Sequence, residues 1–509
     1  MNINSLKLSP LRNCIESIFI PCRPRNVSLS LPPKLALCVC AILGLALTSG
    51  AQTPICGNIT TVTWALTGNP YIIACDSTVP SGQTLTIQPG VIVWLGSNVT
   101  LTVNGSIQAV GIPGANPANR IIFQAPVPSQ HWNSVQLNHS GAINRFKYCD
   151  FQNANLALSL KVAAVNDTMY NEIMNCNFNN CTNAAIYGES EGYYTGFFGG
   201  YRPLEPNLNP TIKNCTFNNC GDGCRFYLYG HSQQTGGGGT VTGRGSASPR
   251  IIGNIFTGLV GKAFNMTAGA YPKSSTPIFI NNTIMNSQGG VESQEPWDVR
   301  IQDNIFVGVT NAVKKSGSLS LTTSYNDFYG NATNFTGYPP NYGQWIIPNR
   351  NGTLADLSFN ISQDPQFVGA GDFHLANGSP CIDAGTPDTA FCDLCMSNAP
   401  SQGAQFPDLG AYGGPDACNW LDIVPKLSVR ASMSKLNNVI FLNWAAIPRS
   451  EYQVQYVTNL ALVGTNNWLN FPSGRVIATE KPTSLPVSTG TTQSNAFFRI
   501  QSLGRPTGN

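Results

Sequence analysis

Hydrophobic and polar positions recur as a short phrase between residues 146 and 331. The phrase is clearest in IMNCNFNN, which begins at Ile173, and in IKNCTFNN, which begins at Ile212. A recurring unit of this kind, interrupted by insertions, indicates a repeat architecture. Aligned on its large apolar residue, the phrase recurs at Phe151, Phe178, Phe217, Phe256, Ile284, Phe306 and Phe328. The intervals between these positions are unequal, and the last two are equal to each other and shorter than the rest.

Three further columns of this alignment have a consistent chemistry. Five residues before the aromatic stand Phe146, Ile173, Ile212, Ile251, Phe279, Ile301 and Thr323. Two residues before it stand Cys149, Cys176, Cys215, Asn254, Asn282, Asn304 and Asn326. Two residues after it stand Asn153, Asn180, Asn219, Gly258, Asn286, Gly308 and Gly330. Asn and Gly tolerate turn dihedrals, so the last column predicts a bend in every repeat.

The shortest interval sets the size of the repeating unit. A period of about 22 residues leaves room for two or three short strands and for no helix. No window shows apolar residues at helical spacing, which excludes a βαβ unit. We therefore predict an all-β parallel solenoid, in which each coil is completed by the coils on either side. Like side chains then lie on like, so Phe178, Phe217 and Phe256 are expected to form one column with stacked rings.

The phrase I-x-N-[CN]-x-F-x-[NG] resembles the right-handed parallel β-helix repeat of pectin-lyase-like proteins. It is followed by an inward apolar residue at Leu158, Ile186, Phe226, Phe264, Val291 and Val313. DPQF, DFHL, SPCIDAG and PDLGAYGGP, within residues 361–418, resemble the closing segment of secreted bacterial β-helix proteins of the choice-of-anchor type. We expect this segment to close the open last coil. The fold itself serves lyases, hydrolases, adhesins and spacers, so it does not assign a function.

Beyond Trp420 the pattern changes to short alternating strands at 439–444, 452–456 and 497–500. This pattern predicts a small antiparallel β-sandwich and resembles the fibronectin III-like, or Ig-like, domains of secreted bacterial enzymes. The predicted organisation is a signal region at 1–51, a parallel β-helix at 52–424 and a C-terminal sandwich at 425–509.

The N-terminal region predicts export. Residues 35–47 form an apolar run that follows several basic residues and precedes Ser49-Gly50-Ala51. The run is too short to span a bilayer and is typical of a secretory signal cleaved after Ala51. The formal net charge of +3 falls to −1 once this region is removed, which leaves no basic patch. We expect a secreted monomer without a transmembrane anchor or a nucleic-acid partner.

Twelve cysteines follow the signal region, an even number that suits an oxidising compartment. Cys56 and Cys75 are expected to pair. The column cysteines, together with Cys181 and Cys220, fit either cross-coil disulfides or a stack of buried thiols. The cysteines nearer the C-terminus could bind zinc or form disulfides. Export favours disulfides, with Cys395 and Cys418 as one expected pair.

The length variation of the repeat falls at one corner of the coil, after the strands that contain Ile186, Phe226, Phe264 and Val291. Long loops at one corner are expected to wall a groove, a common place for binding residues. Alternation predicts that six strand residues face outward there, namely Tyr187, Arg225, Tyr227, Asn265, Glu292 and Lys314. The loops add two aromatic residues, Tyr194 and Trp297. Aromatic rings beside charged groups suit a polysaccharide. The alternative is a Glu292–Lys314 surface ion pair with tyrosines that only pack the loops.

The resemblance also implies a candidate catalytic group. Lyases of this fold hold Ca²⁺ on carboxylates and use a basic side chain to remove a proton, and hydrolases of the fold use aspartates. Glu292, Glu295, Asp298 and Arg300 are the candidates in this chain, with Arg225 and Lys314 as alternative bases. The chain lacks the Asp-Asp, Asn-Thr-Asp and Gly-His-Gly motifs of polygalacturonases and the W-x-D-H of pectate lyases. A non-catalytic surface or adhesion protein is therefore the alternative function.

Ca²⁺ is the one cofactor that the sequence suggests. Asp388, Asp393 and Asp408 are candidates for a structural Ca²⁺ site, and turn formation is the alternative role of these aspartates.

Overall fold

The computed structural model describes most of residues 52–420 and six C-terminal strands. The described ranges are 52–113, 117–196, 200–235, 238–294, 298–316, 322–369, 371–393, 401–403, 406–417, 420, 432–436, 439–444, 451–457, 469–477, 483–486 and 497–504. The predicted signal region, Glu295, Trp297, Cys395 and Cys418 lie outside them. In the described part, no helix is both long and apolar enough to cross a bilayer.

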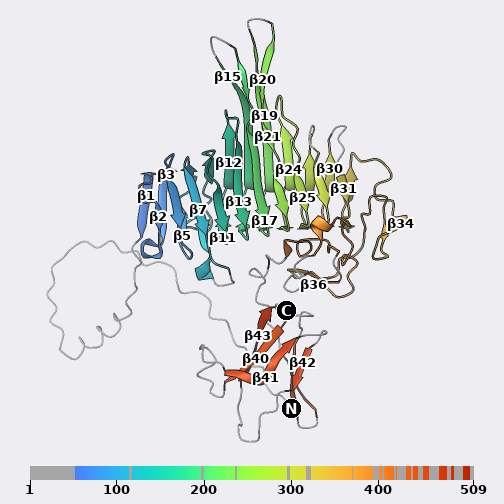
Figure 1. The fold of residues 1–509 in the computed structure, drawn as a ribbon. Coiled ribbons are helices and arrows are strands. Elements are labelled where there is room, and N and C mark those ends of the chain that lie inside the picture. Colours follow the sequence, from blue (N-terminus) through green and yellow to red (C-terminus); the bar gives the residue numbers. More distant parts are fainter. Residues whose placement is uncertain are drawn as a thin grey trace, which may run out of the picture. The chain divides into compact units, whose positions relative to one another are not determined.

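The described chain before residue 337 is a parallel β-helix, as predicted (Figure 1). Its coils contribute short strands to three parallel ladders, and the repeat aromatic lies in the first, the phenylalanine ladder. This ladder consists of β3 (Tyr71–Val79), β5 (Ile92–Leu95), β8 (Ile121–Gln124), β11 (Cys149–Gln152), β14 (Asn177–Asn179), β18 (Thr216–Asn218), β23 (Ile255–Thr257), β26 (Thr283–Met285), β29 (Ile305–Val307) and β32 (Asp327–Tyr329). At the N-terminal end, β1 (Thr53–Asn58) pairs with β3.

The second ladder, here called the tyrosine ladder, carries Tyr187 and follows the first along each coil. It starts from the end of β3 and consists of β6 (Thr100–Val103), β9 (Ser134–Asn138), β12 (Leu156–Ala163), β15 (Ala184–Thr195), β19 (Asp222–Gln234), β24 (Lys262–Ala268), β27 (Gly289–Ser293), β30 (Asn311–Lys315) and β33 (Thr333–Thr336).

The third ladder, here called the isoleucine ladder, forms a separate sheet. It consists of β2 (Thr63–Trp64), β4 (Thr84–Ile87), β7 (Ser106–Val110), β10 (Asn144–Lys147), β13 (Thr168–Met174), β17 (Asn207–Lys213), β22 (Arg250–Ile252), β25 (Ile278–Ile280), β28 (Arg300–Gln302) and β31 (Thr322–Ser324), with β21 (Ser246–Ala247) beside β17. The described residues also contain three short 3-10 helices, at Leu66–Gly68, Pro117–Asn119 and Thr389–Phe391.

The predicted aromatic column is confirmed. Phe178 pairs with Phe217, and Phe217 with Phe256, in the parallel register. Their ring centroids lie 4.9 and 4.5 Å apart with nearly parallel planes. The rings are fully buried, and the column also extends to Phe123, which stacks on Phe151 at 4.9 Å. The phenylalanine stack therefore forms a continuous part of the core between neighbouring coils.

The predicted bend column is also confirmed. All seven of its residues adopt positive φ, from 50° at Asn286 to 64° at Gly308. The buried asparagines of the neighbouring column then form a ladder of their own. The side chain of Asn254 donates to Asn282, that of Asn282 to Asn304, and that of Asn304 to Asn326, at 2.9 to 3.0 Å. The ladder continues to Asn360, which the repeat alignment did not include.

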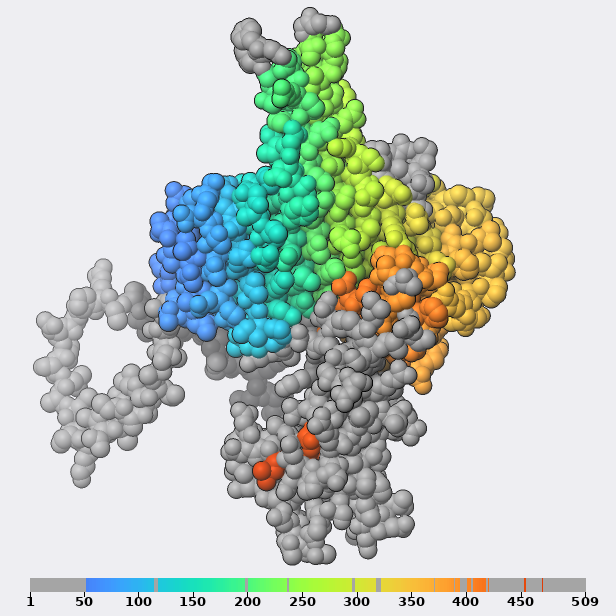
Figure 2. Space-filling model, in the orientation of Figure 1, coloured from blue at the N-terminus to red at the C-terminus, as the bar shows by residue number. Residues whose placement is uncertain are grey.

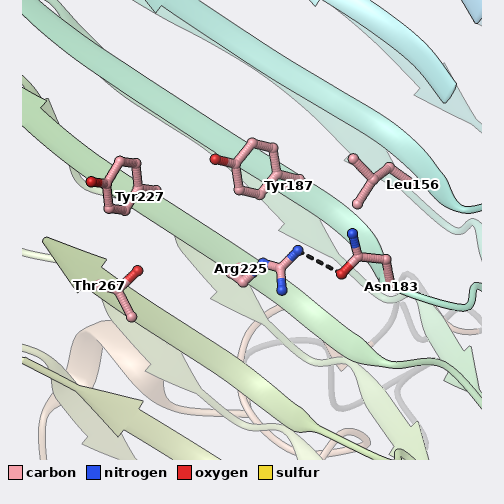
Figure 3. A pocket seen from close by; sticks show the side chains of 6 residues that line it. All are labelled: Leu156, Asn183, Tyr187, Arg225, Tyr227 and Thr267. Atoms are coloured by element: carbon pink, nitrogen blue, oxygen red, sulfur yellow. Dashed lines mark hydrogen bonds between the residues drawn. The ribbon is translucent and has the colours of Figure 1, made fainter. Parts of the chain in front are cut away.

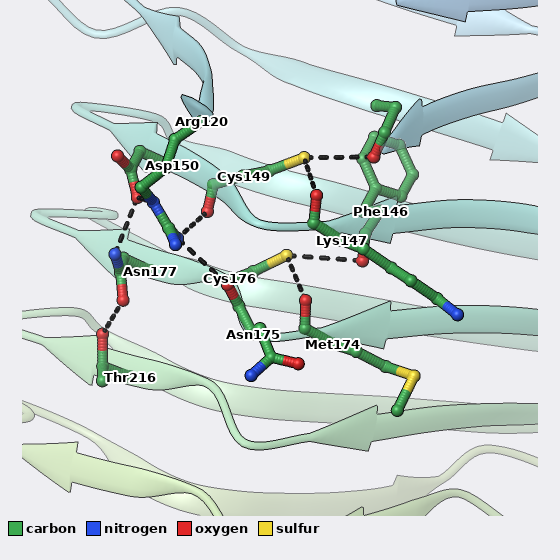
Figure 4. A network of polar contacts seen from close by, with 11 residues as sticks. Arg120, Phe146, Lys147, Cys149, Asp150, Met174, Asn175, Cys176, Asn177 and Thr216 are labelled. Carbon is green, nitrogen blue, oxygen red and sulfur yellow. Dashed lines mark hydrogen bonds and ion pairs between the residues drawn. The ribbon is translucent and has the colours of Figure 1, made fainter. Parts of the chain in front are cut away.

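A polar network ties together the coils that precede this ladder (Figure 4). The guanidinium group of Arg120 binds Asp150 at 2.7 Å and donates to the carbonyl oxygens of Cys149 and Asn175 at 3.0 Å. Asn177 also donates to Asp150, at 2.7 Å, and accepts from the hydroxyl of Thr216. Burial raises the pKa of Asp150, although Arg120 and Asn177 oppose the shift. This chain of contacts links four consecutive coils through polar side chains.

Among the described residues, the cysteines form one disulfide, and the others are buried free thiols. Cys56 and Cys75 are bonded, as predicted. Of the two alternatives for the column, the structure has free, buried thiols at Cys149, Cys176 and Cys215, and likewise at Cys181 and Cys220. Burial and the neighbouring thiol Cys176 raise the pKa of Cys149, which keeps it protonated. Cys381 and Cys392 are also free thiols, whereas the Cys395–Cys418 prediction lies outside the described residues.

One inward position of the tyrosine ladder differs from the prediction. Ile186 pairs with Cys224, and Cys224 with Phe264, so Cys224 occupies the place expected for Phe226. Phe226 lies two residues further along, opposite Gly188, where a Cβ atom would stand 2.4 Å from its ring. The bulky ring therefore fills the space that a glycine leaves open, and the small thiol takes the regular position.

The two longest insertions fold as hairpins rather than as the loops that we expected. β15 continues past the coil and pairs antiparallel with β16 (Arg202–Leu204), and β19 does the same with β20 (Thr240–Arg244). Figures 1 and 2 show the two hairpins side by side, projecting from the coils as an arm. We call residues 191–196, 200–204, 230–235 and 240–244 the arm. Within the aligned repeats the length variation does fall at one corner, as predicted.

The closing segment contacts the last coils and then runs back along the bend before the phenylalanine ladder. Gln363 donates its backbone N–H to Asp327 at 3.0 Å. Further on, Ala411 donates to Thr283 at 3.0 Å, and Asp416 binds the ammonium group of Lys213 at 2.8 Å. The segment thus reaches coils that lie far earlier in the sequence. A short hairpin of β34 (Ile347–Pro348) with β35 (Leu354–Ala355) precedes the segment, and a second, of β36 (Phe367–Gly369) with β37 (Asp372–Leu375), lies within it.

The C-terminal region forms two three-stranded antiparallel sheets, in agreement with the predicted β-sandwich. One contains β38 (Ser432–Leu436), β39 (Val439–Trp444) and β42 (Thr483–Pro486). The other contains β40 (Glu451–Val457), β41 (Leu469–Ile477) and β43 (Phe497–Gly504).

Candidate functional site

The outward residues predicted along the tyrosine ladder lie on one face. Tyr187 pairs with Arg225, Arg225 with Asn265, Asn265 with Glu292, and Glu292 with Lys314. Tyr227 lies one pair further along β19, opposite Glu189. Parallel register with alternating faces therefore brings together side chains from five successive coils that are far apart in the sequence.

A shallow pocket of about 350 Å³ opens on this face (Figure 3). Three of the predicted residues line it, namely Tyr187, Arg225 and Tyr227. The remaining lining residues are Leu156, Asn183 and Thr267, which the sequence reasoning missed. The alternation that identified Asn265 would also have identified Thr267, two residues later. Asn183 precedes its strand in a turn, where a sequence gives no direction for the side chain.

Arg225 is held in place at the pocket by three groups. It donates to the side-chain oxygen of Asn183 at 2.8 Å, and its guanidinium group lies 5.4 Å from the ring centre of Tyr187. Asp222, three residues earlier, provides a carboxylate at 3.7 Å. The guanidinium group has five N–H donors, so these contacts leave donors for a ligand. Arg225 is thus ordered, and its charge is partly compensated.

The two tyrosines of the pocket offer rings and hydroxyl groups. The hydroxyl of Tyr187 donates to Glu189 at 3.3 Å. Partial burial, together with the charge of Glu189, raises the pKa of Tyr187 to about 12, so this phenol stays neutral at ordinary pH. The ring of Tyr227 lies 5.3 Å from that of Tyr229, two residues further along the strand. The aromatic surface therefore continues from the pocket toward the arm.

Asn265, Glu292 and Lys314 stabilise the ladder beside the pocket. Glu292 binds Lys314 at 3.1 Å, the ion pair that the sequence offered as an alternative, and also Lys262 at 3.0 Å. Burial alone would raise the pKa of Glu292, but the two ammonium groups outweigh it and lower the pKa. Asn265 is buried and donates to Asp222 at 3.2 Å. None of the three is a lining residue of the pocket.

The structure separates the described members of the candidate catalytic group. Glu292 belongs to the tyrosine ladder, whereas Arg300 begins β28 in the isoleucine ladder. Arg300 contacts the closing segment, with its guanidinium group 3.5 Å from Asp388 and 4.5 Å from the ring centre of Phe391. Asp298 is exposed between the two strands. Arg300 therefore serves to hold the closing segment, since its charged group is directed at that segment.

Tyr194, predicted from the insertions, belongs to the arm. Its hydroxyl donates to the side chain of Gln233 at 3.0 Å, and its ring meets that of Tyr201 edge-on at 5.6 Å. On the opposite face of the arm, His231 stacks on Tyr193 at 4.2 Å and contacts the carboxylate of Glu191 at 2.7 Å. These contacts connect the two hairpins through side chains as well as through the backbone.

The aspartates predicted as calcium candidates have other partners. Asp388 pairs with Arg300, and Asp408 accepts backbone N–H groups from Asp383 and Gln402. Asp393 accepts from Asp408 and Gly414. Burial, followed by the charge of Asp408, raises the pKa of Asp393 to about 9. Among the residues that the structure describes, no group of three or more His, Cys, Asp or Glu side chains is arranged to hold a metal ion.

A second pocket, of about 380 Å³, opens beside the isoleucine ladder and was not predicted. Its lining is polar and lacks aromatic residues. Lys273 and Glu205 form an ion pair there at 2.8 Å, and Asp167 contacts His139 at 3.1 Å. Asn207 and Ser246 extend the lining across neighbouring coils. Without rings for stacking, this pocket is less suited to a sugar than the first.

Compared with known proteins, the chain matches no family model and none of the curated proteins.

Proposed function

We propose that the protein is a secreted β-helix protein that binds an extracellular polysaccharide at the pocket formed by Tyr187, Arg225 and Tyr227. The observation that carries the proposal is the joint lining of one open pocket by two tyrosine rings, a guanidinium group and the amide of Asn183. Rings pack against the apolar faces of sugars, and the polar groups hydrogen-bond to sugar hydroxyls. The resemblance of the repeats to pectin-lyase-like proteins supports the same class of ligand.

Binding, rather than cleavage, is the activity that this arrangement supports best. The described acidic groups nearest the pocket each have a basic partner: Asp222 lies beside Arg225, Glu189 beside Lys161, and Glu292 between two lysines. A general acid needs a carboxyl group that stays protonated at the working pH. The pKa of Glu292 is lowered instead, which favours its ionised form.

The test is a glycan array with the full-length protein, followed by affinity measurement with Tyr187→Ala and Tyr227→Ala. We expect each variant to weaken binding about tenfold or more, as expected for truncation of a central aromatic contact. Tyr170→Ala is the matched control, because Tyr170 is 53% exposed and lies on the isoleucine ladder. Equal binding by all four proteins would refute the proposed pocket. Reducing-end and unsaturated-uronate assays on bound polymers test for cleavage separately.

The second candidate function is a surface or adhesion protein that does not bind a glycan. The projecting arm favours it, because paired hairpins offer a contact surface beyond the coils (Figure 2). A glycan array on which the wild-type protein binds nothing would support this candidate.

A further inference from the structure

We propose that the polysaccharide bound at this pocket is uncharged. This inference rests on the proposed function and specifies its ligand. The starting point is the charge balance of the pocket and of the outward face of the tyrosine ladder around it. On and around that face the described residues place four basic and four acidic side chains, with histidine counted as neutral: Lys161, Arg225, Lys262, Lys314, Glu189, Glu191, Asp222 and Glu292. Lys315, at the end of β30, is not counted with them, because its ammonium group lies over the ring of Tyr338, 5.8 Å from the ring centre.

Each of the four basic side chains has a carboxylate partner. Lys262 and Lys314 lie 3.0 and 3.1 Å from the two oxygens of Glu292. Arg225 lies 3.7 Å from Asp222. Lys161 lies 3.9 Å from Glu189. A polyuronate, which carries one carboxylate per sugar, would have to compete with these groups for every cation.

The carboxylates also lie where they would repel an anionic chain. Glu189 accepts the hydroxyl hydrogen of Tyr187, which lines the pocket, and its register partner is Tyr227. Glu191 is the next outward residue along β15, beside Tyr229. Charges of like sign this close to a ligand site are unfavourable, particularly where the site is partly shielded from water. An anionic chain that followed the aromatic surface toward the arm would pass both glutamates.

The groups directed into the pocket suit neutral hydroxyls instead. The phenol hydroxyls of Tyr187 and Tyr227, the hydroxyl of Thr267 and the amide of Asn183 can all donate or accept hydrogen bonds with sugar hydroxyls. Arg225 supplies further donors, and its charge is partly compensated by Asp222. A cationic polymer would likewise have to compete for carboxylates, since Asp222, Glu189 and Glu292 each have a basic partner and Glu191 is hydrogen-bonded to His231.

The experiment compares soluble polymers of different charge by affinity electrophoresis of the full-length wild-type protein and Tyr187→Ala. The panel is a neutral β-glucan, xyloglucan and galactomannan, the polyuronates polygalacturonate and alginate, and the cationic polymer chitosan, at about 50 and 500 mM NaCl. We expect binding to at least one neutral polymer that changes less than twofold with salt and is lost in Tyr187→Ala. Tyr227→Ala is the second variant should Tyr187→Ala fail to fold.

Tyrosine-dependent binding to a polyuronate or to chitosan alone, with a strong decrease at high salt, would overturn this inference and leave the proposed binding pocket standing. Tyrosine-independent binding, or no binding to any polymer, would overturn the proposed function and this inference with it.

Discussion

At the scale of single residues, cysteine and asparagine play the same part in one column. Asn254 donates its side-chain N–H to the carbonyl oxygen of Ile212 in the preceding coil. Cys215 directs its thiol at the corresponding carbonyl of Ile173, and Cys176 at that of Phe146. The change from Cys to Asn along the column therefore preserves a donor to the same backbone position. Because the amide oxygen of Asn is a stronger acceptor than a thiol sulfur, the asparagines add a ladder of side-chain hydrogen bonds from coil to coil.

Asn282→Ala should destabilise the protein by about 1–3 kcal/mol, because it leaves buried backbone groups of the preceding coil without a partner. The backbone N–H of Asn254 and the carbonyl of Ile251 would both lose a hydrogen bond. Chemical unfolding of the full-length protein measures the change. Asn218→Ala is the control, since Asn218 is exposed. Equal stability of the two variants would contradict the structural role of the ladder.

The buried carboxyl of Asp327 predicts a loss of stability as pH rises. Burial raises its pKa from 3.8 to about 8, although hydrogen bonds from Gln363 and Cys381 oppose the shift. The folded protein therefore holds a proton that the unfolded chain releases near pH 4. Its stabilising effect is complete below about pH 4 and is lost as pH rises toward about 8.

Asp327→Asn should flatten this decrease and stabilise the protein above about pH 8, because the amide stays neutral. Thermal unfolding midpoints across the pH range measure the effect, and the exposed Asp364→Asn serves as control. Part of the decrease in stability with rising pH will remain in this variant, since burial also raises the pKa of Asp303 to about 8. An unchanged pH profile in Asp327→Asn would show that Asp327 is ionised in the folded protein.

At the scale of elements, the arm depends on close approach of its two hairpins. A Cβ atom on Gly243 would lie 1.6 Å from the carbonyl oxygen of Tyr193, and one on Gly192 would lie 2.2 Å from the backbone nitrogen of Arg244. The hairpins therefore pack backbone against backbone, and any side chain at these two positions forces them apart.

Gly243→Ala should loosen the arm at a cost of about 1–3 kcal/mol, the range for overpacking, while the coils remain intact. Hydrogen exchange should rise in residues 191–195 and 230–244 and stay unchanged in the phenylalanine ladder. Gly369→Ala is the control, because a Cβ atom there meets nothing within 4 Å. Unaltered exchange in the arm would show that the two hairpins are not packed this closely.

The elements of the coil were predictable because each coil repeats the last, so seven aligned phrases report on the same position. The column of Phe178 and the outward position of Arg225 followed from that repetition. Cys224 was missed because a small thiol gives a weaker hydrophobic signal than the nearby Phe226. The insertions occur once each and offer nothing to align, so the hairpins of the arm and the path of the closing segment could not be derived from the pattern. Asn183 was missed because it lies in the turn before β15, where alternation gives no direction for a side chain.

At the scale of the β-helix, stability is distributed along one dimension, since each coil contacts mainly its neighbours. An end coil has a neighbour on one side only and should open first. At the N-terminal end, the Cys56–Cys75 disulfide joins β1 to β3 and compensates for the missing neighbour. A disulfide of this loop length contributes about 2–4 kcal/mol.

Cys56→Ser with Cys75→Ser should therefore increase hydrogen exchange in Thr53–Asn58 and leave the interior coils unchanged. The remaining described cysteines are already free thiols, so the double variant changes no other described cross-link. The control is a substitution of Ser77, which is buried in β3 opposite Gly57 of β1. It should raise hydrogen exchange in Thr53–Asn58 less than the double variant does, because it breaks no covalent link. Uniformly raised exchange along all the coils would indicate that the β-helix unfolds as one unit.

The equal spacing of Ile284, Phe306 and Phe328 bears on how such a chain grows. The two coils that these residues delimit have the same length and no insertion, and their strands match position by position. Tandem duplication of one such coil would add one whole rung and lengthen the three ladders by about 4.8 Å. A change that shifted the register of a strand by one residue would turn its core side chains outward. Evolution and protein engineering can therefore change the length of this molecule only in whole units.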